Sequence, residues 1–323
     1  MIGLIDKENM LFVLDDFPQQ IVKGFELGEK VNVNGAFKNI VFSGMGGSGL
    51  PGDIARTLLR DRCDIPVISQ KDYGLPKFVS KDTLFFAVSY SGNTEETLDA
   101  YRVARGKGCT IVAICSGGKL REIAEKDNVA HIVVPTAVAA RTSIGYMFFA
   151  ALRVLVNSGI VKEDVNGIAE KLQNPDFKMK GEELASSIMN KIPIIYASEA
   201  MGVAALVWKV CFNESAKIPS FVNVFPELNH NELMAYTKPQ EKFHVIFIRE
   251  DDCSRQLAKR FKMTRDLISS KVSTTEMVVK GNGQLLKLFS AIYIGYWTSY
   301  FLALKYRVDP ADTKLQAEFK KKL

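Results

Sequence analysis

Hydroxyl side chains are concentrated in one short segment of this 323-residue chain. They follow the apolar run 84–88, which is typical of a strand, and surround the expected start of a helix near residue 94: Ser89, Ser91, Thr94 and Thr97. A helix N-terminus attracts anions, because its first N–H groups are unpaired and its dipole is positive there. Since the segment contains no Lys or Arg, hydroxyls and backbone amides would hold the anion. The alternative is a Ser/Thr capping box that only stabilises the helix.

A second segment of similar character is rich in glycine and spans residues 43–49. It lies between a strand-like run at 40–42 and a helical stretch expected at about 51–60, and its glycines allow backbone N–H groups to approach a ligand. Three glycines also match the dinucleotide pattern G-x-G-x-x-G: Gly44, Gly46 and Gly49. That pattern needs an acidic residue at the end of the next strand, where this chain has Gln70 and Lys71. We therefore favour a small phosphorylated ligand shared by the two segments.

Glu214 and His230 are candidates for proton transfer. An apolar helix expected from about Val203 brings Glu214 to its C-terminal end before Pro219. The helix dipole and the apolar neighbours both favour the protonated form of a carboxyl group there, which suits a general base that takes and returns a proton. His230 lies in a polar loop, and a histidine can exchange a proton near neutral pH. The plainer interpretations are a surface Glu214 balanced by Lys217 and a structural histidine.

Composition excludes several classes of protein. An apolar fraction of 47% and a charged fraction of 24% are typical of a globular chain, and the net charge of +6 is spread along it. The first thirty residues carry six acidic and three basic side chains, a poor surface for nucleic acid. Five cysteines without a C-x-x-C pair, and residues 1–6 without a signal-peptide pattern, favour the reducing cytoplasm. No two of the three histidines are close enough in the sequence to suggest a metal site, and His131 and His244 lie in strand-like runs and are expected in the core.

The elements that must position these groups alternate between strand and helix patterns. Strands are expected at 39–43, 65–69, 83–89, 110–115 and 131–134, each followed by a helical or turn segment. Such alternation predicts a parallel sheet with helices on both faces and with ligands at the carboxyl ends of its strands. Both candidate anion-binding segments fall at that edge.

The same pattern repeats in weaker form in the second half. Residues 192–202 have the strand-and-turn shape of residues 39–49, and the run 244–248 corresponds to the strand before Ser89. Arg-Glu-Asp-Asp at 249–252 replaces the hydroxyls, so the second half is expected to be a copy that has lost the phosphate site.

The expected domains are residues 1–156, which bind phosphate, and residues 191–323, joined by a helical linker or crossover at 157–190. The uncharged run 288–304 is shorter than a membrane span and contains several hydroxyl side chains. It is therefore expected to be a buried helix, and no membrane association is predicted.

The sequence resembles the sugar isomerase (SIS) domain, through the strand followed by S-x-S-x-x-T-x-E-T. It is similar in more detail to the archaeal-type bifunctional phosphoglucose/phosphomannose isomerases, through residues 43–49, 89–97, 135–142, 213–217 and 227–232. This resemblance implies an α/β fold of two SIS-type subdomains, each a parallel sheet flanked by helices in an αβα sandwich. It also implies a metal-independent, homodimeric isomerase without a cofactor, which interconverts glucose 6-phosphate and mannose 6-phosphate with fructose 6-phosphate through an enediolate.

The resemblance implies a role for each matching residue. The phosphate would be bound by one group of residues: Gly47, Ser48, Ser89, Ser91 and Thr94. Glu214 would move the proton between C1 and C2, and Arg141 would bind the substrate and stabilise the enediolate. His230, contributed by the partner subunit, and Lys320 would open the sugar ring, while Thr313 would let the site accept both C2 epimers.

The C-terminal assignments have alternatives. Thr313 and Lys320 are seven residues apart and would share one face of a helix held in place by Leu315 and Phe319. Three other lysines compete with Lys320, and a frayed basic tail is the plainer interpretation: Lys314, Lys321 and Lys322. Two other functions also stay open, a non-catalytic SIS-domain sensor of phosphosugars and an aminosugar-phosphate isomerase.

Overall fold

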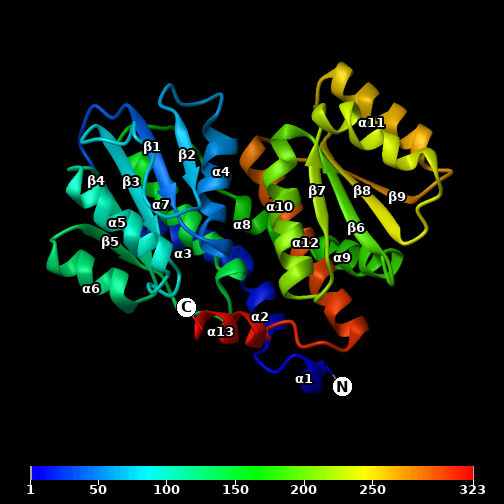
Figure 1. Ribbon diagram of the computed structural model, residues 1–323, viewed down its shortest axis with the longest axis horizontal. Coiled ribbons are helices and arrows are strands. Elements are labelled where there is room, and N and C mark those ends of the chain that lie inside the picture. The colour runs from blue at the N-terminus through cyan, green and yellow to red at the C-terminus, as the bar shows by residue number, and fades with distance from the viewer. Residues whose placement is uncertain (1, 323) are drawn as a thin grey trace. The chain divides into compact units, whose positions relative to one another are not determined.

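The computed structural model describes residues 2–322 and divides into two compact units (Figure 1). The N-terminal unit is Asp15–Gln173, and the C-terminal unit combines the residues up to Leu14 with those from Asn174 onward. These units differ from the expected domains in two respects. The first helical residues belong with the second half of the chain, and the expected linker at 157–190 is divided between the units.

The N-terminal unit contains a parallel five-stranded sheet in the order β2-β1-β3-β4-β5. The strands are β1 (Asn39–Ser43), β2 (Val67–Gln70), β3 (Thr83–Val88), β4 (Thr110–Cys115) and β5 (Ala130–Val133). The helices are α3 (Phe17–Leu27), α4 (Leu50–Leu59), α5 (Glu95–Gly106), α6 (Gly118–Lys126), α7 (Ile144–Asn157) and α8 (Ile168–Leu172), with 3-10 turns η1 (Gly46–Ser48) and η2 (Ala140–Thr142). The five strands predicted from the first half are all present, with bounds shifted by no more than two residues.

Both faces of this sheet are covered by helices. Every residue of β1 and β3 is buried, as expected for central parallel strands, which read as nearly continuous apolar runs. On one face, Phe85 packs in a cluster with residues of α5 and α6. On the other face, Phe42 and Phe86 stack with ring centroids 4.4 Å apart, and Gly52 of α4 approaches Phe42. The unit is therefore an αβα sandwich.

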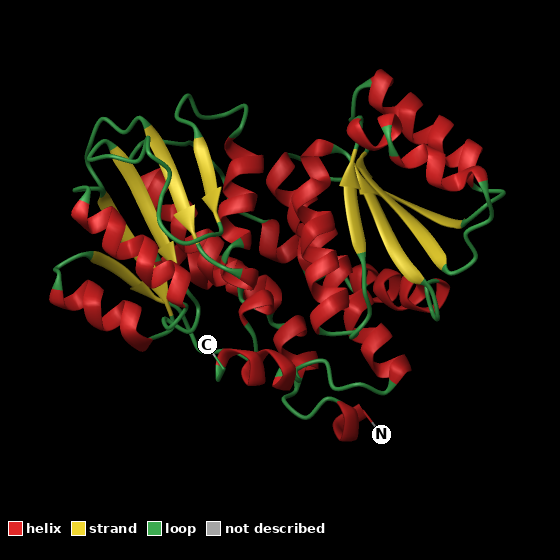
Figure 2. Ribbon diagram, viewed as in Figure 1, coloured by secondary structure: helices red, strands yellow, loops and turns green. Residues whose placement is uncertain are grey.

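The C-terminal unit contains a second sheet, whose strands are drawn in yellow in Figure 2. This sheet is also parallel, and its strand order is β7-β6-β8-β9. Its strands are β6 (Ile192–Ala197), β7 (Phe221–Val224), β8 (Phe243–Glu250) and β9 (Ser273–Val279). Its helices are α1 (Ile2–Ile5), α2 (Met10–Asp15), α9 (Asp176–Ser187), α10 (Gly202–Glu214), α11 (Arg255–Ile268), α12 (Gln284–Tyr306) and α13 (Lys314–Lys320), with 3-10 turns η3 (Glu199–Met201), η4 (Glu227–His230) and η5 (Glu232–Thr237). The edge strands β7 and β9 are not evident in the sequence, because their half-buried residues mix polar and apolar types.

The repeat predicted from the sequence is confirmed by the strand order. If β6 corresponds to β1, then the order β7-β6-β8-β9 repeats the order β2-β1-β3-β4. Each sheet is parallel throughout, with its second strand in the chain at one edge. The two units are thus two versions of one α/β topology.

Helix α12 forms the centre of the C-terminal unit and contains the uncharged run 288–304. It packs against α9 and α10, and its close approach to α10 depends on Gly295, where a Cβ would lie 2.2 Å from the Trp208 ring. The Trp208 Nε1–H donates to the Ala291 carbonyl at 2.8 Å. The prediction of a buried helix is confirmed, and within residues 2–322 no helix is long and apolar enough to cross a membrane.

The two histidines expected in the core differ in environment. His244 is buried, its ring nitrogens lie 3.0 Å from Ser273 Oγ and 2.9 Å from Thr275 Oγ1, and burial lowers its pKa to about 4. His131 is not a core residue, because it lies in the edge strand β5 with 29% of its side chain exposed. Its Nε2 lies 3.7 Å from Glu125, near the surface.

Candidate active site

The two predicted anion-binding segments meet at the carboxyl edge of the N-terminal sheet. One follows β1 and the other follows β3, and these two strands are neighbours. The Tyr90 backbone N–H donates to Ser48 Oγ at 2.9 Å, so a hydrogen bond joins the glycine-rich segment directly to the hydroxyl segment. Ser48 is buried at this junction.

The hydroxyl segment does not form a capping box at the start of α5. Thr94 is the N-cap residue of α5, but its side chain makes no capping hydrogen bond. Its Oγ1 instead accepts from Ser89 Oγ at 2.9 Å, so the alternative of a simple capping box is wrong. Ser91 is exposed, and its Oγ accepts from the Asn93 N–H at 3.3 Å. Thr97 is fully buried, and its Oγ1 has no hydrogen-bond partner among the described residues.

Arg141 is brought to the same edge by the 3-10 turn η2. A Cβ at Gly47 would lie 2.5 Å from the Arg141 nitrogen, so the backbones of the two segments touch where Gly47 has no side chain. Arg141 is only 2% exposed, and the turn that contains it is held by the Ser143 hydroxyl, which donates to the Ala139 carbonyl at 2.9 Å. All five predicted phosphate ligands and Arg141 thus belong to one continuous cluster of loops.

Tyr90 joins these loops, although it was not among the site residues predicted from the sequence. Its N–H binds Ser48, its carbonyl accepts from the Ser116 hydroxyl at 2.7 Å, and its own hydroxyl lies 3.0 Å from the Ala137 carbonyl. It therefore joins the loops after β1, β3 and β4 to the segment that leads to Arg141. An aromatic residue between two serines in a polar loop was the available signal.

Glu214 occupies the last position of α10, as predicted, and is half-buried. Lys217 binds this end of the helix, because its ammonium group donates to the Glu214 carbonyl and, at 2.6 Å, to the Asp312 carbonyl. Asp312 immediately precedes Thr313. The structure therefore brings the predicted base and the Thr313 segment together within the C-terminal unit.

The C-terminal helix exists, but its expected anchoring does not. Thr313 is the N-cap residue of α13, and Lys320 is its last residue. Leu315 and Phe319 were expected to pin this helix, yet their side chains are 81% and 64% exposed. That prediction is wrong for the described chain, because the seven-residue helix buries none of its residues.

His230 and Glu214 lie at opposite ends of the strands of the C-terminal sheet. Helix α10 follows β6 and packs along β6 and β7. Its last residue, Glu214, therefore lies near the end of the sheet where the parallel strands begin. His230 is exposed in η4, beyond the carboxyl end of β7. A helix of 13 residues spans about 20 Å, so one chain holds these two groups well apart.

The segment that follows β8 carries charged side chains where the segment that follows β3 carries hydroxyls. Ala87 packs on the face covered by α5 and α6, and Phe247 packs on the corresponding face covered by α11, so Arg249 is at the position equivalent to Ser89. The Glu250 carboxylate is buried and accepts from the Ser198 hydroxyl at 2.5 Å.

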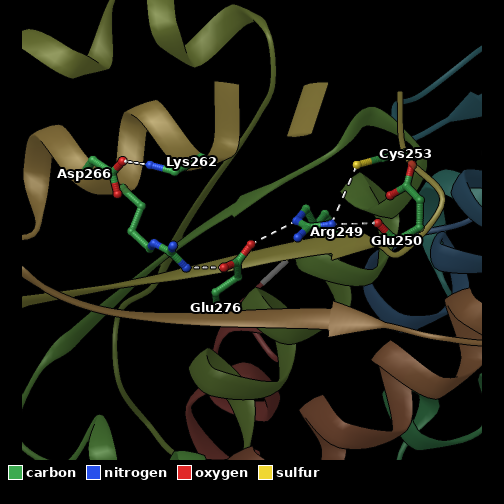
Figure 3. A network of polar contacts seen from close by, with 7 residues as sticks. Arg249, Glu250, Cys253, Lys262, Asp266 and Glu276 are labelled. Carbon is green, nitrogen blue, oxygen red and sulfur yellow. Dashed lines mark hydrogen bonds and ion pairs between the residues drawn. The ribbon is translucent and has the colours of Figure 1, made fainter. Parts of the chain in front are cut away.

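A network of charged side chains surrounds this position (Figure 3). Arg249 donates to Glu276 at 2.9 Å, and Arg265 of α11 pairs with the other oxygen of the same carboxylate. Arg249 is already paired with Glu276, and the buried carboxylate of Glu250 next to it would repel a phosphate, so no phosphate site is expected in the second half. Among residues 2–322 there is also no cluster of three or more His, Cys, Asp or Glu that could hold a metal ion.

Comparison with known proteins identifies the family. The SIS domain model matches residues 37–158, and the model of the bacterial phospho-glucose isomerase C-terminal SIS domain matches residues 177–323. The bifunctional phosphoglucose/phosphomannose isomerase of Caldicellulosiruptor bescii is 38% identical over 95% of this chain and 97% of its own length. The chain belongs to the bifunctional phosphoglucose/phosphomannose isomerase family.

The chain is also similar to two proteins that do not carry the name of this isomerase family. The D-glucosamine-6-phosphate 4-epimerase of Sulfolobus acidocaldarius is 36% identical over 66% of this chain and 69% of its own length. A hypothetical protein of Thermus thermophilus has a similar structure, with a TM-score of 0.77 over 96% of this chain and 89% of that one. Its sequence identity is 15%, so it shows a shared fold alone.

Proposed function

We propose that this chain interconverts glucose 6-phosphate and mannose 6-phosphate with fructose 6-phosphate, through proton transfer between C1 and C2 of an enediolate. The observation that carries the proposal is the similarity to a bifunctional phosphoglucose/phosphomannose isomerase over nearly the whole chain. The joined loops of the N-terminal unit support it, because their hydroxyls and the α5 N-terminus suit a phosphate group.

Each candidate residue takes one role in the proposed reaction. Phosphate is held by hydroxyls and by one glycine backbone: Gly47, Ser48, Ser89, Ser91 and Thr94. Glu214 takes the proton from one carbon and returns it to the other, and Arg141 stabilises the negative oxygen of the enediolate. His230 and Lys320 open the ring, and Thr313 accommodates both C2 epimers. All these steps are acid–base chemistry, so the proposal includes an enzyme that needs neither a metal ion nor a cofactor. The free cysteines suit the reducing cytoplasm, which is the proposed location.

An assay with each aldose phosphate separately tests this function. Purified protein with EDTA present is expected to convert both glucose 6-phosphate and mannose 6-phosphate, measured by coupled detection of fructose 6-phosphate. Turnover that EDTA abolishes and a divalent cation restores would overturn metal independence. Turnover of glucose 6-phosphate alone would remove the role of Thr313.

The same assay separates the competing functions. No turnover of either aldose phosphate, with a melting temperature that fructose 6-phosphate still raises, would favour the sensor. The similarity to a D-glucosamine-6-phosphate 4-epimerase makes glucosamine 6-phosphate the comparison substrate. Turnover of that compound alone would favour an aminosugar-phosphate enzyme.

We further propose that the active form is a homodimer in which His230 acts with Glu214 of the other subunit. The support is that these two residues lie at opposite ends of the strands of one sheet. A ring-opening group and a base must reach the same sugar, which the two residues of a single chain are placed too far apart to do. A second copy could supply the missing histidine without any rearrangement of the sheet. The exposed Leu315 and Phe319 also leave apolar area for a subunit contact.

Mixing two inactive variants tests this arrangement. Glu214→Gln and His230→Ala subunits, unfolded and refolded together in equal amounts, are expected to regain about a quarter of the wild-type activity. Random pairing makes about half of the dimers mixed, and each mixed dimer then has one intact site of two. Each variant refolded alone is the control. Recovery that stays at the level of the separate variants would show that both residues act within one chain.

A further inference from the structure

The segment that carries His230 is anchored on both sides of the histidine. This His230 segment (residues 226–237) contains the turns η4 and η5 and follows the short edge strand β7. Leu228 and Tyr236 are buried in a cluster with Phe225, Phe247 and Phe261. His230 itself is exposed. Two short turns offer little hydrogen bonding of their own, so the position of the histidine depends on contacts with the surrounding elements.

The first anchor lies immediately before the histidine. Asn229 Nδ2 donates to Thr264 Oγ1 of α11 at 2.8 Å, and Arg260 donates to Asn229 Oδ1 at 3.2 Å. Thr264 is 2% exposed, so this contact reaches the inner face of α11.

The second anchor is the carboxylate of Glu232, two residues after the histidine. Its Oε2 accepts from the Tyr196 hydroxyl at 2.5 Å, and its Oε1 accepts from Asn223 Nδ2 at 2.5 Å. Tyr196 belongs to β6 and Asn223 to β7, so one side chain binds the segment to two neighbouring strands. Both carboxylate oxygens are thereby used in holding the segment.

The tyrosine partner is well suited to a permanent contact. Tyr196 is 1% exposed, and its hydroxyl also lies 2.8 Å from the Tyr236 hydroxyl. Burial, followed by the bond to Glu232, raises the pKa of Tyr196 above its ordinary value, so the tyrosine keeps its proton and can donate it. Charge-assisted hydrogen bonds of this kind are about twice as strong as neutral ones.

We propose that Glu232, held by Tyr196 and Asn223, is a positioning residue that fixes His230 for ring opening. The inference rests on the proposed isomerase function and assigns Glu232 no contact with the sugar. The carboxylate acts through the backbone of its own segment, which it joins to the sheet two residues beyond the histidine. Loss of this anchor leaves His230 free to move by distances on the order of 1 Å, a displacement that can cost about 100-fold in rate.

Glu232→Ala tests the proposal, with Glu232→Gln as the conservative variant. Alanine removes both contacts, and kcat is expected to fall about 10- to 100-fold while KM changes less than about twofold, because the phosphate is bound elsewhere. Glutamine can keep both contacts if its oxygen accepts from Asn223 and the Tyr196 hydroxyl turns to donate to Tyr236. It is therefore expected to retain most of the activity. The matched control is Glu227→Ala, because Glu227 is an exposed glutamate of the same segment, and its contact at 3.0 Å is to Asn231 of that segment.

Two further measurements separate positioning from general stability. On a His230→Ala background, Glu232→Ala is expected to add little to the loss of kcat, because both changes remove the same contribution. Amide hydrogen exchange of residues 226–237 is expected to accelerate in Glu232→Ala but not in Glu227→Ala. Unchanged exchange, unchanged kcat, equal loss with glutamine, or a fully additive double variant would each overturn the proposal. If the wild-type protein has no isomerase activity, the proposed function fails, and the exchange data still decide whether Glu232 anchors the segment.

Discussion

Glu214→Gln is expected to lower kcat for both aldose phosphates by about 10²- to 10⁴-fold, with KM nearly unchanged. Glutamine has almost the same shape as glutamate but cannot take a proton from carbon. Glu214 lies at the end of α10, where Lys217 binds the last helical carbonyl, so the backbone around it should keep its place. Steady-state kinetics in both directions, together with the melting temperature, would measure the effect.

Glu183→Gln is the matched control for this variant. Glu183 is an exposed glutamate on α9 of the same unit, and the substitution removes the same charge. It should leave kcat within about twofold of wild type, as is usual for surface changes. If Glu214→Gln keeps more than about a tenth of the wild-type kcat at an unchanged melting temperature, another group must act as the base.

Gly47→Ala is expected to reduce kcat/KM about 100-fold and to weaken the binding of inorganic phosphate. The added methyl group would lie 2.5 Å from the Arg141 nitrogen and 2.7 Å from the Ala140 carbonyl carbon. Both are backbone atoms that cannot rotate away, so either the glycine-rich segment or the Arg141 turn must move. A shift on the order of 1 Å in either one displaces a ligand of the phosphate or of the enediolate.

Gly106→Ala provides the comparison for this glycine. Gly106 ends α5, and a Cβ there would meet no atom within 4 Å, so the protein should keep its activity and its stability. Overpacking at Gly47 should also cost about 1–3 kcal/mol of unfolding free energy, which thermal denaturation would detect. Wild-type kinetics in Gly47→Ala would show that this close approach does not position Arg141.

Local sequence patterns predicted the elements that bury continuous apolar runs. Strands β1, β3 and β4 and helix α12 are evident because nearly every residue in them is apolar and buried. Strand β9 is not evident, because it lies at a sheet edge and its half-buried residues include Thr275 and Glu276. His131 was misplaced for the same reason, since an apolar run does not reveal which strand becomes the edge.

The sequence also predicted which residues of the N-terminal unit belong together, because residue type and spacing encode a loop at the end of a parallel strand. It could not show how they are joined. The Tyr90 bonds and the contact between Gly47 and Arg141 connect segments that are more than forty residues apart in the chain. Such contacts exist only after the sheet has brought the segments to one edge.

The amino-acid sequence by itself determined the family, the repeated α/β topology and the chemical types of the candidate groups. Only the tertiary structure decided that Glu214 lies beside the Thr313 segment, that it lies at the opposite end of the strands from His230, and that Leu315 and Phe319 stay exposed. The physical reason is that the spacing of apolar residues along an element shows how much of that element is buried. That spacing does not show at which end of the sheet the element stops, because this depends on the direction and order of strands that are distant in the chain.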